Sequence, residues 1–246
     1  MTLESPSAPG AKIDTLLTRD QVGAMFDAVA PRYDLLNRVL SFGVDRRWRV
    51  GAVRDLELRP GDRLVDICGG TGDLTREAER QVPGVKAVNV DLSRAMLAGH
   101  RRRAAREGGE AACIAGDAMR LPLRTGSAAG AIIGFGIRNV PDRLAALREI
   151  HRVLAPGGRL VVLEFGLPPR RMIRGPYLIY LKHVLPRMAA ALSPEPTAYR
   201  YLGDSILAFP PPAEFGRLLA QAGFASVSWR TLSMGVAVRY LAQRGS

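Results

Sequence analysis

The segment 63-RLVDICGGTGDLT-75 decides the fold of this 246-residue chain. Its apolar start predicts a buried strand, and the glycine-rich turn that follows leads into a helix. Glycines in such a turn let the backbone approach a ligand closely. Since ligands of open α/β sheets lie beyond the carboxyl ends of the strands, residues 66–73 form a candidate binding site.

Strands and helices alternate through the following hundred residues. This alternation predicts a parallel sheet with right-handed crossovers. The turn 156-PGG-158 is expected to end the helix before the fifth strand. The expected strands after the first are 85–90, 111–115, 129–135 and 159–165, and the helix before the fifth strand covers 141–154.

The C-terminal part changes from this pattern. A helix at about 212–222 precedes two strand-like runs, 225–230 and 236–241, which would add an antiparallel edge. Apolar spacing also predicts helices between residues 21 and 56, with a second helix beginning at Pro31. The sequence therefore predicts an α/β fold, a doubly wound and mostly parallel seven-stranded sheet with N-terminal helices.

Length and composition indicate one domain. A chain of 246 residues with 47% hydrophobic residues can bury a substantial core. We expect a flexible tail over 1–19 and a single domain over 20–246, with an apolar helical insertion at about 170–208 as a substrate lid. Cys68 and Cys113 are too few for a disulfide framework, and no secretory signal precedes the domain, so a cytoplasmic location is expected.

The net charge of +12 has two interpretations. It could serve nucleic acid, an anionic membrane or an acidic substrate, or it could reflect a genome that favours arginine, which is the interpretation we favour. No Asn/Asp-Pro-Pro-aromatic motif follows the fourth strand, and no stripe of aromatic residues is available to stack on bases. We therefore expect no nucleic-acid partner. No Cys/His spacing or acidic pair suggests a metal.

The glycine-rich turn differs from that of a nucleotide dehydrogenase. Gly70-x-Gly72 is followed by Thr75 where the third glycine of G-x-G-x-x-G would fall. Asp73 at the helix start would repel a pyrophosphate, whereas the sulfonium and ammonium groups of S-adenosylmethionine are compatible with an acid there. The turn therefore favours S-adenosylmethionine over NAD.

Two further strand ends carry acids. Asp91 ends the second strand 19 residues after Gly72, where a carboxylate can accept hydrogen bonds from both ribose hydroxyls. Asp117 ends the third strand, where it can meet the adenine amine while Ala118 offers its backbone. The alternative is that both acids merely cap the helices that follow. Three strand ends in the correct order favour a cofactor site.

Longer motifs make a resemblance specific. They are 26-FDAVAPRYDLLN-37 with 41-SFGVDRRW-48, then 135-FGIRNV-140, 152-RVLAPGGR-159 with 163-LEF-165, 183-HVLP-186 and 199-YRYLGDSI-206. The chain resembles the ubiquinone/menaquinone biosynthesis C-methyltransferase family from about residue 20 to the end. The resemblance implies a Rossmann-like fold and methylation of demethylmenaquinol or related polyprenyl quinols by S-adenosylmethionine.

The resemblance also implies a set of cofactor-binding residues. This chain has Asp117, Gly134 and Cys68 where family members often have Asn, Ser and Ala, and the glycine puts a cofactor contact at that position in doubt. The implied cofactor-binding residues are Tyr33, Gly69, Gly70, Thr71, Gly72, Asp91, Asp117, Ala118 and Gly134.

The chemistry of C-methylation needs few residues. A hydroquinone carbon becomes nucleophilic once a phenol hydroxyl ionises, and phenols have a pKa of about 10. We expect Arg138 to stabilise that oxyanion and Asn139 to orient it. Arginine is a poor base, so a water, His183 or Tyr201 would take the proton. The alternative for Arg138 and Asn139 is a plain turn, and for His183 a helix-surface position.

The insertion suggests the partners. The apolar segment 172–192 could line a channel for a polyprenyl tail, act as a core helix or form a homodimer face. Lys182, His183, Pro186 and Arg187 interrupt its apolar run, which argues against a spanning helix. The partner expected from the resemblance is a lipophilic quinol, and arginines beside the segment could contact the inner face of a membrane; they are Arg170, Arg171 and Arg174.

Rival functions remain open at this stage. They are a nucleic-acid methyltransferase, a non-catalytic cofactor-binding protein and a methyltransferase for another small phenol or natural product. The sequence does not distinguish a naphthoquinol from a benzoquinol acceptor.

Overall fold

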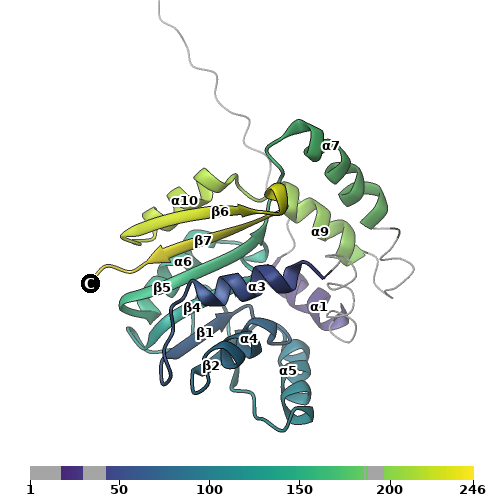
Figure 1. Cartoon of the computed structure of the whole chain (residues 1–246). Coiled ribbons are helices and arrows are strands. Elements are labelled where there is room, and N and C mark those ends of the chain that lie inside the picture. The colour runs from purple at the N-terminus through teal and green to yellow at the C-terminus, as the bar shows by residue number, and fades with distance from the viewer. Residues whose placement is uncertain (1–17, 30–42, 186, 188–196) are drawn as a thin grey trace, which may run out of the picture.

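The computed structural model describes residues 18–29, 43–185, 187 and 197–246 (Figure 1). Within these ranges a single seven-stranded sheet runs through the molecule, in the order β3-β2-β1-β4-β5-β7-β6. The first five strands are parallel, and β7 pairs antiparallel with both β5 and β6. The strands are β1 (Arg63–Ile67), β2 (Lys86–Asp91), β3 (Cys113–Ala115), β4 (Ala128–Gly134), β5 (Leu154–Phe165), β6 (Ser226–Leu232) and β7 (Ala237–Gln243).

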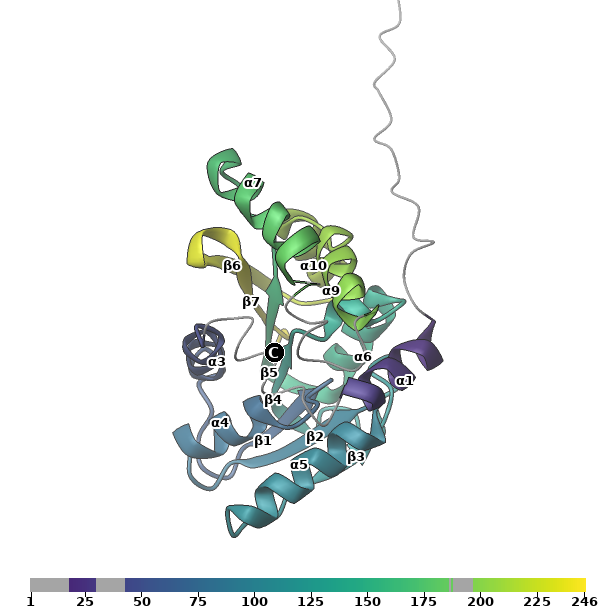
Figure 2. The same cartoon turned by 90° about the vertical axis from the view of Figure 1, so that its right-hand side faces the viewer.

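Helices cover both faces of the sheet, and Figure 2 shows α3 and α6 on opposite sides of it. Side chains alternate between the faces along each strand, so neighbours in β4 enter different cores. Ile133 packs with Leu147 of α6 and Phe215 of α10, whereas Ile132 packs with Trp48 of α3 and Leu74 of α4. The helices are α1 (Arg19–Val29), α3 (Asp45–Arg54), α4 (Asp73–Gln81), α5 (Arg94–Arg106), α6 (Arg143–Val153), α7 (Arg171–Ile179), α9 (Thr197–Leu207) and α10 (Pro212–Gln221).

The predicted seven-stranded, doubly wound sheet is therefore confirmed, with differences at several boundaries. The third strand is shorter than expected, and α6 begins at Arg143 because the side chain of Asp142 caps it by accepting from Ala145 N at 2.9 Å. The turn 156–158 ends no helix; it lies inside β5. Backbone bonds explain this, since Gly157 N donates to Arg244 O at 3.2 Å and Arg244 N donates to Gly158 O at 2.9 Å.

The structure describes the insertion over 170–185 and 197–208, and its helices lie beyond the carboxyl end of β5 (Figure 1). Its helix α7 continues into the π-helix η3 (Tyr180–Val184) and has no buried residue. Leu181, Leu185 and Ile206 form a small core of their own that also contacts Phe165. Among the described residues no helix is long and apolar enough to cross a membrane. Of the tail expected over 1–19, residues 1–17 lie outside the described residues, whereas Arg19 already begins α1. The helix expected from Pro31 also lies outside the described residues.

Candidate active site

Side chains pack so closely against the glycine-rich turn that two of its positions have no room for a side chain. Gly72 has φ +79° and directly precedes α4, and a Cβ there would lie 2.4 Å from the ring of His100. A Cβ at Gly69 would lie 2.6 Å from Asn89 Oδ1. Both positions therefore require glycine. Asn89 in turn donates to Gly70 O at 3.0 Å and lies 3.0 Å from His100 Nδ1.

Asp66 joins β1 to the first turn of α4. Its Oδ2 accepts from both the backbone N (3.0 Å) and the Oγ1 (2.7 Å) of Thr75. Complete burial raises the pKa of Asp66 to about 7. Thr75, which the sequence marks only by the missing third glycine, thus anchors a buried acid.

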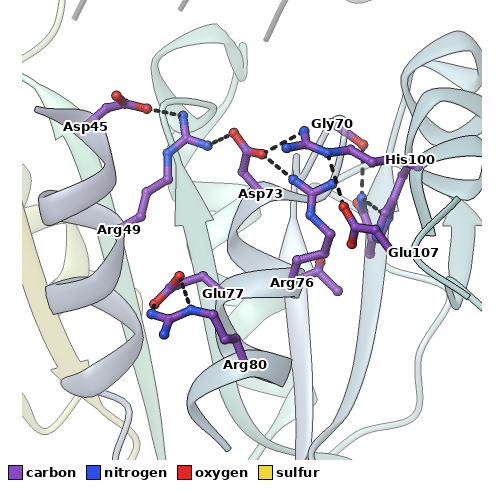
Figure 3. A network of polar contacts seen from close by, with 12 residues as sticks. Asp45, Arg49, Gly70, Asp73, Arg76, Glu77, Arg80, His100 and Glu107 are labelled. Atoms are coloured by element: carbon purple, nitrogen blue, oxygen red, sulfur yellow. Dashed lines mark hydrogen bonds and ion pairs between the residues drawn. The ribbon is translucent and has the colours of Figure 1, made fainter. Parts of the chain in front are cut away.

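Asp73 does not behave as the sequence suggested. Figure 3 shows its carboxylate beside Arg49 of α3 and Arg76 of α4. Arg103 Nη1 of α5 also lies 3.2 Å from its Oδ1. Burial alone would raise the pKa of Asp73, but the three guanidinium groups lower it. Asp45 and Glu107 pair in turn with Arg49 and Arg103, so three carboxylates face three guanidinium groups at this helix start. Asp73 is therefore not the isolated negative charge that the sequence suggested, and its repulsion of a pyrophosphate stays a prediction.

A pocket opens beside the glycine-rich turn, at the point where the strand order of the sheet reverses, between β1 and β4. Its empty volume is about 750 Å³, a figure that includes the open mouth. Its walls come from the ends of several strands and from α1. Its lining residues include Phe26, Cys68, Gly70, Asp91, Asp117, Ala118, Met119, Phe135, Gly136 and Asn139.

Asp91 stands in this pocket and fixes two backbone amides. Gly70 N donates to its Oδ2 and Ser93 N to its Oδ1, both at 2.8 Å. The cap of α5 is instead Ser93, whose Oγ accepts from Met96 N at 3.1 Å. A carboxylate has about four acceptor positions, so Asp91 keeps acceptor capacity for a ligand. Burial raises the pKa of Asp91.

The next strand end and the N-terminal helix complete the pocket. Asp117 accepts from Met119 N at 2.9 Å, and Ala118 and Met119 line the wall beside it. Phe26 of α1 also lines the pocket, while Asp27 accepts hydrogen bonds from Ser93 Oγ and Ala95 N. The role of α1 was missed in the sequence-based prediction, although Phe26 begins one of the quoted motifs.

Known proteins settle the family. The ubiE/COQ5 methyltransferase family matches residues 14–244. The chain is 45% identical over 216 residues, 88% of its length, to the ubiquinone/menaquinone biosynthesis C-methyltransferase UbiE of Syntrophotalea carbinolica, of which the match covers 91%. It is also 45% identical to the demethylmenaquinone methyltransferase of Thermus thermophilus, with 89% of this chain and 100% of that protein covered. This chain belongs to the ubiE/COQ5 methyltransferase family.

This membership confirms the expected enzyme class, a methyltransferase dependent on S-adenosylmethionine. Solved structures confirm the fold. A SAM-dependent methyltransferase of Thermotoga maritima has a TM-score of 0.63 at 20% identity, covering 90% of this chain and 99% of that one. The cyclase SpnF has a TM-score of 0.71 at 18% identity, covering 94% and 97%. A cyclase among such neighbours shows that the fold alone does not define the chemistry.

At the end of β4, this member of the family has a short 3-10 helix, η2 (Ile137–Asn139). Asn139 lines the pocket, and its buried Oδ1 has no hydrogen-bond partner among the described residues. Arg138 is 5% exposed and does not line the pocket; its Nη1 is paired with Glu164 Oε1 at 2.9 Å. The sequence did not reveal this partner, which lies 26 residues further along the chain.

The remaining predicted site residues are distributed as follows. Tyr201 is buried near Arg138 and Arg143, whose positive charges oppose the rise of its pKa that burial causes. Its Oη lacks a hydrogen-bond partner among the described residues. His183 is exposed on η3, and no described contact joins it to η2. Gly134 faces Leu74, since a Cβ there would lie 2.5 Å from Leu74 Cδ1. Thr71 is buried in the turn without lining the pocket, and Tyr33 lies outside the described residues.

Proposed function

We propose that this chain transfers the methyl group of S-adenosylmethionine to a ring carbon of demethylmenaquinol or a related polyprenyl quinol. The observation that carries the proposal is one pocket that joins two acidic strand ends to Asn139. The names of the relatives that match nearly the full chain support the quinol as acceptor.

The residues of the pocket fit the cofactor. Asp91 would accept from the ribose hydroxyls while it holds the Gly70 and Ser93 amides. Asp117 and the backbone after it would meet the adenine. The bound cofactor supplies an electrophilic methyl group on a sulfonium.

The acceptor side would consist of Asn139 and the cluster beside it. The unpartnered Oδ1 of Asn139 is suited to accept a hydrogen bond from a quinol hydroxyl. Arg138 lies next to this position in a pair with Glu164, and the remaining donors of its guanidinium group would bind a phenolate oxygen more strongly than a phenol. Burial raises the pKa of Tyr201, so we expect its hydroxyl to stay protonated and to donate rather than to act as the base. His183 is too exposed for that role as it stands, which leaves water as proton acceptor.

A direct test uses the purified protein with S-adenosylmethionine and a chemically reduced demethylmenaquinone of short tail. We expect a product heavier by about 14 mass units, the mass of the added CH2, and no product from the oxidised quinone, because only the quinol provides a nucleophilic carbon. Arg138→Ala should still bind the cofactor and lose turnover. Methylation of small phenols in place of quinols would instead favour the alternative, a methyltransferase for another phenolic acceptor.

Contact with an anionic membrane surface is a second part of the proposal. Helix α7 leaves Met172 90% and Ile179 59% exposed, and Arg170 and Arg171 are exposed beside it. Apolar side chains flanked by cations suit a surface of anionic lipid, where a polyprenyl quinol resides. We expect the protein to sediment with vesicles that contain anionic lipid more than with neutral vesicles. Equal sedimentation with both would refute this part.

A further inference from the structure

The guanidinium group of Arg138 is fixed on several sides. Its Nη1 donates to Glu164 Oε1 and to Phe135 O, and its Nε donates to Ser205 Oγ at 3.3 Å. The ring of Phe165 lies 5.5 Å from its Cζ. No described residue bonds its Nη2. The Nε and Nη1 side of the planar guanidinium group is therefore fixed, whereas the N–H donors of Nη2 stay available.

Glu164 is the central partner in this arrangement. It is 0% exposed at the end of β5, and both of its oxygens are used within the turn. Oε1 accepts from Arg138 Nη1 and from Phe165 N, each at 2.9 Å, and Oε2 accepts from Arg138 N at 3.2 Å. A single carboxylate thus fixes both the backbone and the side chain of Arg138.

Stability alone gives little reason for such a pair. Desolvation of two charges offsets most of their attraction, and well-packed apolar residues often serve as well or better. The pair is placed where it affects the site, because Phe135, Gly136 and Asn139 on either side of Arg138 line the pocket. A shift of the arginine would therefore move the donors next to Asn139.

We propose that Glu164 is a positioning residue that holds Arg138 with its Nη2 available to the ionised oxygen of the acceptor. The inference rests on the proposed function. Ser205 contributes from α9, so the insertion is part of the same support. Ser205 Oγ also donates to Leu202 O at 3.0 Å, which fixes the hydroxyl in its own helix.

A double-mutant cycle separates positioning from a general structural role. Glu164→Gln, Arg138→Gln and the double variant are compared with the wild-type enzyme for kcat with the quinol and for the Kd of S-adenosylmethionine. Glutamine keeps the size of Glu164 but turns one acceptor into a donor facing Arg138. We expect kcat to fall about 100-fold in Arg138→Gln, the order found when an oxyanion donor is removed. Glu164→Gln should lose a similar factor, and the double variant should be no slower than Arg138→Gln alone.

The matched control is Glu149→Gln. Glu149 also holds an arginine and a backbone amide, because Arg152 Nε donates to it at 2.8 Å and Leu121 N at 2.9 Å. It does not line the pocket. We expect its substitution to leave kcat within about twofold of wild type, since a partly exposed pair away from the site contributes little.

Equal loss of kcat by Glu164→Gln in the wild-type and Arg138→Gln backgrounds would overturn the positioning role, as would a parallel loss of cofactor affinity. If Glu164→Gln does not fold, Ser205→Ala replaces it. That variant removes only the bond to Nε and should lower kcat about fivefold, with no effect in the Arg138→Gln background. A wild-type enzyme that binds S-adenosylmethionine but methylates no quinol would overturn the proposed function, and the positioning role with it.

Discussion

Asp91→Asn should weaken the binding of S-adenosylmethionine far more than it weakens the fold. The carboxylate accepts from Gly70 N and Ser93 N at 2.8 Å and, in the proposed complex, from the ribose hydroxyls. Asparagine has one acceptor oxygen, so its side-chain NH2 group would face another donor, which is either the Gly70 or Ser93 N–H or a ribose hydroxyl. A hydrogen bond to a charged group contributes about 1.5–3 kcal/mol. A loss of about 3 kcal/mol corresponds to a Kd roughly 100-fold higher.

Isothermal titration of S-adenosylmethionine into each variant measures this change, and thermal unfolding without ligand reports on the fold. Asp62→Asn is the control, because Asp62 also accepts from a backbone amide, Arg59 N at 2.7 Å, but lies before β1 at its amino end. It should leave the Kd within about twofold, since it makes no contact with the pocket. An Asp91→Asn protein that binds the cofactor within threefold of wild type would refute the ribose contact.

Three other changes test the support of the turn and the cover of the pocket. The pKa of Asp66 is about 7 in the folded state, above its ordinary 3.8, so between these two pH values the folded protein binds one more proton than the unfolded chain. The wild type should therefore lose stability relative to Asp66→Asn as the pH rises from about 4 to about 7. Urea unfolding at each pH measures this loss. Gly72→Ala should lower the free energy of unfolding in urea by about 3 kcal/mol, because the φ of Gly72 is +79° and the added methyl group would clash with the ring of His100. A decrease below about 1 kcal/mol would contradict this geometry. Asp27→Ala removes the hydrogen bond to Ser93 that holds α1 at the pocket, so the dissociation rate of S-adenosylmethionine should rise about fivefold in stopped-flow measurements. An unchanged dissociation rate would contradict a role of α1 in retaining the cofactor.

The strand ends could be predicted because their signals are local. A glycine-rich turn after an apolar run, and single acids after the next two strands, require only neighbouring residues to be recognised. For Asp91 the structure also shows that Ser93, not the acid, caps the next helix. Whether Asp91 and Asp117 bind the cofactor stays a prediction until binding is measured.

Partners distant in sequence could not be predicted. Nothing near Asp73 indicates that Arg49 and Arg103 would neutralise it from 24 and 30 residues away. The position of Arg138 depends in the same way on Glu164 and Ser205, which come from β5 and the insertion. Charge alone, without these contacts, gave an incomplete description of both residues.

The place of β7 in the sheet has a consequence for how the protein is made. β7 lies between β5 and β6, although it follows both in the chain, so β6 joins the sheet only through it. A nascent chain that has reached residue 235 contains β6 but not β7, so the antiparallel edge of β5 has no partner yet. The pocket strands β1 to β4 come earlier and need no residue of this hairpin for their pairing. The cofactor half of the sheet can therefore assemble first during synthesis, whereas β5, which carries Glu164, gains its second partner only after β7 has been synthesised.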